Sequence, residues 1–166
     1  RLLQKEGAFG NPLIQEAKKY NTLEEFVNAQ GEPVYRGART PELKETSGDL
    51  GTGFYFTKDN GLAKIYAKNT GMVHEYVIDP RAKIVDQSKI PYGVNREEWA
   101  TQNGYDGISY KQGSYADTAE FKDSQNLLIY NKDIIKTRSQ LTDIWKQAHP
   151  ESNFSPEVQR IINMTK

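Results

Sequence analysis

The pattern of apolar and polar residues changes its period along the chain, and each change marks an expected element. Apolar residues recur at helical spacing in the first 32 residues and again after residue 138. Between these segments, short β-prone runs are mixed with short helical stretches and polar loops. The strands are expected at residues 34–37, 53–57, 72–78, 83–85, 105–110 and 127–130.

Helix starts are marked by side chains that can cap a first turn. Thr22 and Glu25 have the spacing of a capping box, and Asp59 and Asn95 each precede a helical run. Pro156 suits the first position of a final helix. Because strands and helices are mixed irregularly, without the regular alternation of a doubly wound sheet, we expect an α+β fold.

The length of 166 residues is typical of one domain. We expect a single monomeric domain over residues 1–166, with a helical N-terminal segment at 1–32, a core at 33–137 and C-terminal helices at 138–166. The first residues lack an initiator Met, which predicts a module of a longer polypeptide.

The charge balance and the residue types limit the chemistry. Lys and Arg total 22, as do Asp and Glu, so no net charge attracts nucleic acid or an anionic membrane, which favours protein as the macromolecular partner. The absence of Cys and the presence of two His argue against disulfides and a metal site. No apolar run approaches about 18 residues, so we expect no membrane segment. The expected location is the cytoplasm of a host or target cell, including entry by injection or secretion.

Three segments, in this order, carry a resemblance. They are Tyr35-Arg36-Gly37, the run 53–57 with the helix 63–67 behind it, and the run 126–136. Together they resemble the core of the ADP-ribosyltransferase superfamily, most closely the branch of poly(ADP-ribose) polymerases and the transferase domains of phage polyvalent proteins and bacterial toxins. The resemblance implies a split, mixed β-sheet core with NAD, as co-substrate, in a cleft.

The resemblance also implies roles for individual residues. NAD would be bound by Tyr35, Arg36, Gly37, Tyr55, Thr57 and Tyr66, with Tyr55 and Tyr66 stacked on the nicotinamide ring. Glycine lets the backbone approach a ligand, and a guanidinium can bridge pyrophosphate or ribose oxygens. Tyr55 can equally be a core residue, and Thr57 is more simply a strand-end residue.

The catalytic residues implied are Glu120, Asn126, Arg36 and Tyr55. Asn126 occupies the position of the glutamate that polymerising members carry, and an amide supplies no negative charge to an oxocarbenium-like ribose. Glu120 could bring a carboxylate into the cleft from the preceding loop, with Asp117 and Asp123 as alternatives.

The expected activity follows from this set of residues. We expect cleavage of NAD at the nicotinamide–ribose bond and transfer of a single ADP-ribose to a host macromolecule. The alternatives are a non-catalytic domain of the same fold and an NAD glycohydrolase.

Overall fold

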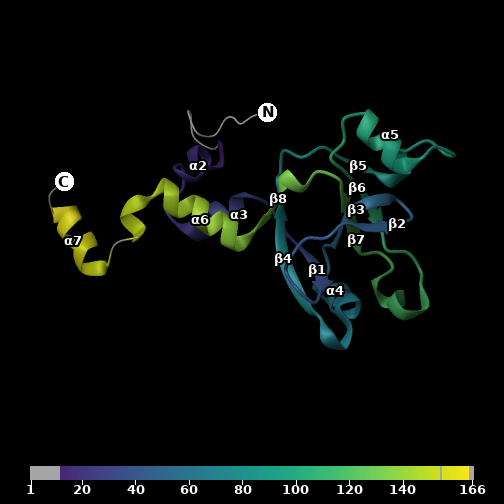
Figure 1. Ribbon diagram of the computed structural model, residues 1–166, viewed down its shortest axis with the longest axis horizontal. Helices are drawn as coiled ribbons and strands as arrows, with labels where there is room; N and C mark the ends of the chain where they lie inside the picture. Colours follow the sequence, from purple (N-terminus) through teal and green to yellow (C-terminus); the bar gives the residue numbers. More distant parts are fainter. Residues whose placement is uncertain (1–11, 154, 165–166) are drawn as a thin grey trace. The chain divides into compact units, whose positions relative to one another are not determined.

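The computed structural model describes residues 12–153 and 155–164, and the predictions for residues 1–11 lie outside them. The chain divides into two units (Figure 1). A helical unit is formed by Arg1–Gln30 and Thr137–Lys166, and a sheet unit by Gly31–Lys136. Within the described residues, no helix combines the length and the apolar character that a membrane crossing needs.

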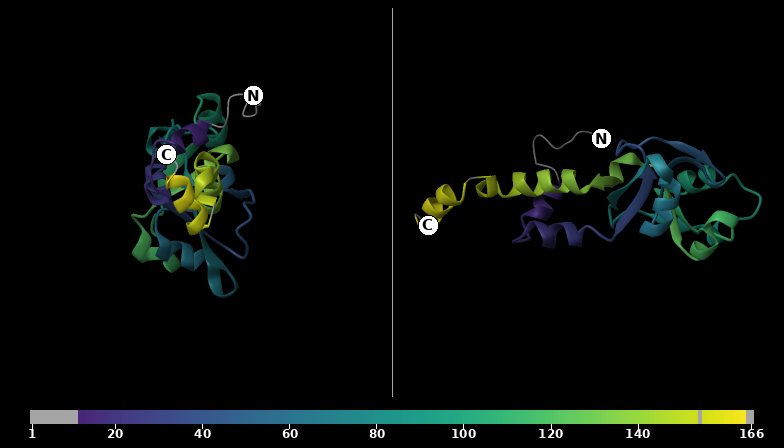
Figure 2. Two further views of the ribbon diagram at one scale, coloured as in Figure 1. Left: turned by 90° about the vertical axis from the view of Figure 1, so that its left-hand side faces the viewer. Right: turned by 90° about the horizontal axis from the view of Figure 1, so that it is seen from below.

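The helical unit combines helices from the N-terminal and C-terminal parts of the described chain. Its described elements are α2 (Pro12–Ala17), α3 (Leu23–Ala29), α6 (Arg138–Ala148), η5 (Pro150–Asn153) and α7 (Pro156–Met164). The purple α2 and α3 lie beside the yellow-green α6 (Figure 2). Thr22 caps α3 by accepting a hydrogen bond from the Glu25 amide, as predicted, and Thr137 with Gln140 forms a full capping box on α6.

The sheet unit contains a mixed sheet, which confirms the α+β class. Its strands are β1 (Pro33–Ala38), β2 (Thr46–Gly48), β3 (Gly51–Thr57), β4 (Met72–Ile78), β5 (Ile84–Asp86), β6 (Gly107–Lys111), β7 (Gln125–Ile129) and β8 (Ile135–Thr137). The spatial order in the described residues is β5-β6-β7-β3-β1-β4-β8, with β2 paired to β3. β5 and β6 are parallel, whereas β6–β7, β7–β3, β3–β1 and β1–β4 are antiparallel.

Short helical segments connect these strands. They are α4 (Asn60–Ala67), η1 (Lys68–Thr70), η2 (Gln87–Lys89), α5 (Arg96–Gln102), η3 (Ala116–Phe121) and η4 (Lys132–Ile134). Asp59 and Asn95 cap α4 and α5 as the sequence predicts. β2 was not predicted, because its Thr-Ser-Gly sequence has no apolar alternation and all three residues are exposed.

Strand alternation gives the sheet two different faces. Phe54 and Phe56 project into one apolar cluster, which also contains Val34, Tyr76, Leu127, Ile129 and Ile135. The intervening residues Tyr55 and Leu128 face the other side, where Leu128 packs with Leu50, Val85, Ala100 and Ile108. The part of the candidate site that is built on β3, β6 and β7 lies mainly on this second face.

Candidate functional site

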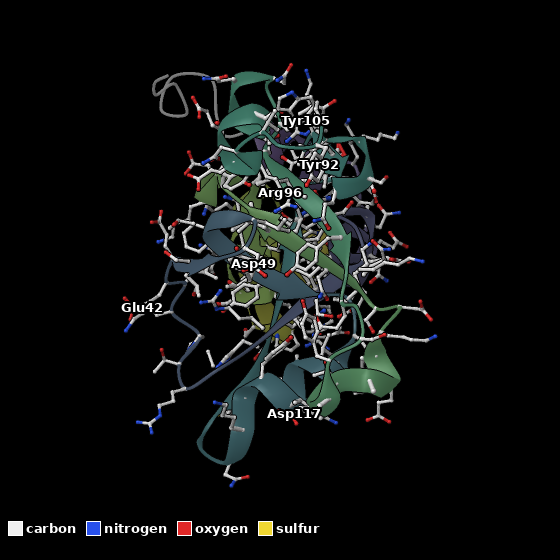
Figure 3. The ribbon with its side chains drawn as sticks, turned by 90° about the vertical axis from the view of Figure 1, so that its right-hand side faces the viewer. Glu42, Asp49, Tyr92, Arg96, Tyr105 and Asp117 are labelled. Carbon is white, nitrogen blue, oxygen red and sulfur yellow. The ribbon has the colours of Figure 1, made fainter. Side chains whose placement is uncertain are left out.

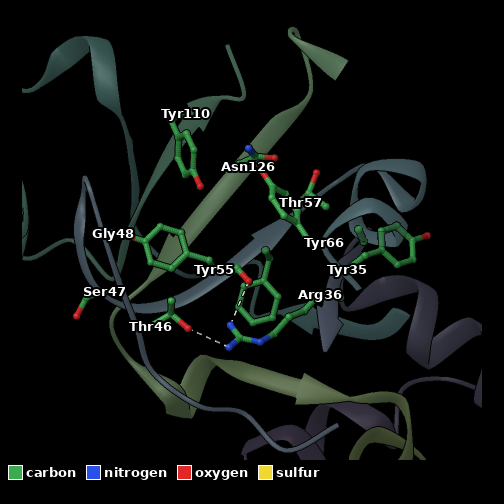
Figure 4. Close-up of a pocket in the computed structure, with 13 residues that line it drawn as sticks. Tyr35, Arg36, Thr46, Ser47, Gly48, Tyr55, Thr57, Tyr66, Tyr110 and Asn126 are labelled. Carbon is green, nitrogen blue, oxygen red and sulfur yellow. Dashed lines mark hydrogen bonds between the residues drawn. The ribbon is translucent and has the colours of Figure 1, made fainter. Parts of the chain in front are cut away.

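The site begins where β1 separates from β3. The two strands pair at one position, Tyr35 opposite Thr57. Beyond this pair a cavity of about 350 Å³ opens, lined by residues of both strands and of α4, β2, β6 and β7 (Figure 4). Its volume falls at the lower end of the range for small-molecule sites, roughly 300–1,000 Å³.

One row of side chains crosses three strands to form the floor of the cavity. Thr57 on β3 is opposite Asn126 on β7, and Asn126 is opposite Tyr110 on β6. Residues directly opposite one another in antiparallel strands project from the same face. Thr57, Asn126 and Tyr110 therefore meet at the cavity, as Figure 4 shows.

Arg36 closes the opposite side of the cavity. Its guanidinium donates to the Tyr55 carbonyl at 3.3 Å, to the Lys44 carbonyl at 2.8 Å and to the Thr46 hydroxyl at 3.2 Å. The Tyr55 carbonyl belongs to β3 where β1 has separated, so the arginine satisfies an acceptor that a continuous ladder would have paired. Burial lowers the pKa of Arg36, although a guanidinium remains charged at neutral pH.

The two predicted stacking tyrosines both line the cavity. The Tyr55 hydroxyl donates to the Gly51 carbonyl at 2.6 Å, which holds its ring against the β2–β3 hairpin, and burial raises its pKa. Tyr66 projects from α4 and remains half exposed. The ring of Tyr35 points away from Asn126 in Figure 4, although Tyr35 contributes to the lining.

Gly37 is required for packing between β1 and α4. A Cβ atom at this position would lie 2.2 Å from the Ala63 carbonyl oxygen and 2.4 Å from the Ala67 nitrogen. Both atoms belong to the helix backbone and cannot rotate away. The glycine thus sets the close approach of the helix that carries Tyr66, a role that the sequence did not reveal.

A buried network holds Asn126. Its Nδ2 donates to Oε1 of Gln112 at 2.6 Å, and Nε2 of Gln112 donates to the Tyr66 hydroxyl at 2.7 Å and to Thr118 Oγ1 at 3.1 Å. Oδ1 of Asn126 is buried and has no hydrogen-bond partner among the described residues. Asn126 is 3% exposed, so this oxygen is an unsatisfied acceptor at the cavity.

Thr57 has a local partner. Its hydroxyl accepts a hydrogen bond from the Asp59 amide at 3.1 Å, just before the Asp59 side chain caps α4. This contact agrees with the simpler prediction for Thr57, a strand-end residue, while its buried position still places it in the cavity floor.

A second cavity of about 650 Å³ adjoins the first and shares Tyr55, Tyr66 and Tyr110 with it. Asp49 and Asp117 are the carboxylates that line this second cavity. Figure 3 shows Asp49 near the middle of this face and Asp117 further down, at η3.

Glu120 lines neither of these two cavities. It is exposed on η3, where the buried residue is Thr118. The described residues that line the first cavity include the cation Arg36 but no carboxylate. Within the described residues, no group of three or more His, Cys, Asp or Glu could hold a metal ion.

The sequence did not identify Tyr110, Gln112 and Thr118 as parts of the site. Gln112 and Thr118 lie in a polar loop with no periodic pattern, and Tyr110 resembles the other strand tyrosines. Burial identifies Gln112 and Thr118: among the described residues, five polar side chains are buried, and Thr57, Gln112, Thr118 and Asn126 are four of these. Thr57 and Asn126 line the first cavity, and Gln112 and Thr118 line the second, so this concentration of buried polar groups marks the region of the two adjoining cavities as specialised.

Comparison with known proteins adds no relative: no family model matches the chain, nor does any curated protein or solved structure.

Proposed function

We propose that the cavity binds NAD and that the protein transfers a single ADP-ribose unit to a protein acceptor. The observation that carries the proposal is the convergence of Arg36, Gly37, Tyr55, Tyr66 and Asn126 on one cavity, although they come from three separate segments of the chain. These are the segments through which the sequence resembles ADP-ribosyltransferases.

The chemistry needs a site that orients the nicotinamide ribose. The bond between ribose C1′ and the nicotinamide nitrogen breaks, and nicotinamide leaves with the electron pair. An acceptor nucleophile then forms a bond to C1′ and loses a proton. Tyr55 and Tyr66 offer aromatic surface for the nicotinamide, and Arg36 offers the positive charge for the pyrophosphate.

Asp117 is the candidate proton acceptor. Both Asp117 and Glu120 are exposed on the same short helix, but only Asp117 lines the adjoining cavity, which shares three tyrosines with the first. In this arrangement the nicotinamide ribose lies in the first cavity and the acceptor side chain enters through the second. The two would come together beside the three tyrosines that both cavities share.

A second candidate function is binding of NAD or ADP-ribose without turnover. The absence of a carboxylate among the described lining residues of the first cavity favours it, because the developing positive charge on the ribose then lacks a negative partner.

The test is incubation of the protein with labelled NAD and a cell lysate, followed by assay of nicotinamide and of label in the protein fraction. Transfer supports the first proposal, and NAD binding without nicotinamide release supports the second. Absence of NAD binding by calorimetry overturns both.

Two isosteric variants separate the carboxylates. Asp117→Asn is expected to lower transfer roughly a hundredfold or more, from the usual contribution of a general base. Glu120→Gln, on the same segment, is the matched control and is expected to retain transfer. The reverse result would assign the proton acceptor to Glu120.

A further inference from the structure

The unsatisfied oxygen of Asn126 shows what the cavity demands of a ligand. A buried acceptor without a partner costs free energy, so a ligand that donates a hydrogen bond to it gains more than one that does not. The Asn126 amide could present either Nδ2 or Oδ1 to a ligand. The choice depends on which of these two atoms is hydrogen-bonded to a neighbouring residue.

Gln112 decides this direction. It is 8% exposed and lies just after β6, between Asn126, Tyr66 and Thr118. Its two N–H groups are both used, one on each hydroxyl oxygen, so only its Oε1 is left for Asn126. Asn126 must then donate through Nδ2, which leaves its Oδ1 as the atom without a partner.

The reverse direction of the network is less favourable. If both hydroxyls donated to Oε1 of Gln112, its Nε2 would have one remaining acceptor, Asn126, for two N–H groups. An N–H without a partner would then be buried at Gln112, and buried unpaired N–H groups are rarer than under-used carbonyls. The observed direction leaves both N–H groups of Gln112 satisfied.

We propose that Gln112 is a positioning residue that fixes the Asn126 amide with Oδ1 toward the cavity, so that the site selects a ligand with a hydroxyl donor at this point. Given the proposed function, on which this inference rests, the donor is a hydroxyl of the nicotinamide ribose. Gln112 also contacts the Tyr66 hydroxyl, so the same side chain holds one wall and the floor of the cavity.

The experiment measures binding by calorimetry for NAD and for two analogues, which lack the 2′- or the 3′-hydroxyl of the nicotinamide ribose. The wild-type protein is expected to bind one analogue about tenfold or more weakly than NAD, the usual effect of leaving a buried acceptor unpaired. Gln112→Met is expected to remove this preference, because methionine has similar length but cannot hold the amide.

Three further variants separate positioning from a general loss of structure. Gln112→Glu is expected to retain the preference, since a carboxylate accepts from Asn126 and from both hydroxyls. Thr118→Val removes one partner of Gln112 and is expected to weaken the preference partly. Gln102→Met, an exposed glutamine on α5, is the matched control and is expected to leave it unchanged.

A spectroscopic readout is independent of NAD. In the unliganded protein, an Asn126 side-chain N–H is expected to give a shifted, slowly exchanging amide signal, which moves to the position of a free amide in Gln112→Met. An unchanged signal in this variant overturns the positioning role.

The outcomes of the binding experiment also differ. If Gln112→Met retains the full preference, or if the wild type has none, the inference fails while NAD binding stands. If the wild type binds no NAD, the proposed function and the ligand part of the inference fail together, and the amide signal still decides whether Gln112 positions Asn126.

Discussion

Strand β1 pairs with β4 at six consecutive positions but with β3 only at Tyr35. On the β4 side, backbone hydrogen bonds hold the strands, and the buried ring of Tyr76 packs edge-on against Phe56. On the β3 side, the backbone ladder ends after one pair. There the Arg36 side chain donates a hydrogen bond to the Tyr55 carbonyl of β3, which no longer has a backbone partner on β1. This chain therefore opens a cavity by ending the β1–β3 ladder early, while β1 remains paired with β4 along its other edge.

The largest loss of stability is expected at Gly37, where β1 packs against α4 beside the cavity. Gly37→Ala places a methyl group against backbone atoms of α4, and overpacking of this kind costs about 3 kcal/mol. Thermal and urea unfolding measure the loss. Gly61→Ala is the control, because its Cβ would meet the ends of two side chains, the Phe121 ring and the Asp59 carboxylate, and not the backbone of another element. Equal destabilisation by both variants would contradict the packing role of Gly37.

The next largest loss of stability is expected from Arg36, whose side chain replaces the missing backbone hydrogen bonds between β1 and β3. Arg36→Ala leaves the carbonyls of Tyr55 and Lys44 without their donor and is expected to lower the free energy of unfolding by about 2 kcal/mol, with loss of NAD affinity. Arg36→Lys retains the charge but not the planar set of donors, so we expect it to restore little of the stability. If the lysine variant is as stable as the wild type in urea titrations, the positive charge alone accounts for the stabilising effect of Arg36.

A smaller loss of stability is expected from a change on the side where β1 pairs with β4. The Tyr76 hydroxyl donates to the Pro41 carbonyl at 2.6 Å and ties the β1–β2 loop to β4. Tyr76→Phe is expected to cost about 1 kcal/mol, the usual value of one hydrogen bond. Hydrogen exchange should then rise in the loop but not in the β1–β4 ladder, and faster exchange within that ladder would contradict this separation.

The smallest effect is a dependence on pH at the end of β4. A hydrogen bond from the Arg81 side chain holds the pKa of Asp79 below its ordinary value. Because the folded pKa is lowered, the stabilisation is present above about pH 4 and is lost as pH falls further. We expect less than about 1 kcal/mol, since the partner is exposed. The stability difference between wild type and Asp79→Asn should shrink from pH 7 to pH 3, and a constant difference would exclude this origin.

Much of the fold follows from local signals. The predicted strand at 72–78 coincides with β4, and the caps at Thr22, Asp59 and Asn95 mark the helix starts, because apolar alternation and side-chain capping act over a few residues. β2 could not be predicted in this way, since its pairing with β3 and its contact with Arg36 join residues that carry no apolar signal.

The site was predictable only as far as its motifs extend. Arg36, Gly37, Tyr55 and Tyr66 belong to recognisable segments, and they line one cavity. Gln112 and Thr118 act through hydrogen bonds that exist only when Gln112 lies between Tyr66 of α4, Thr118 of η3 and Asn126 of β7, so no local pattern identifies them. Glu120 has the right residue type, but η3 turns Thr118 inward and leaves Glu120 exposed.

The separation of β1 from β3 also has a consequence for association with other chains. Two strands that part inside a sheet expose edges that could pair with an extended peptide, and such pairing is a common route to aggregation. In this protein the Arg36 guanidinium occupies the Tyr55 carbonyl and binds Thr46 of the adjacent hairpin. Arg36, which borders the cavity, therefore also blocks the unpaired edge of β3 from pairing with a strand of another chain.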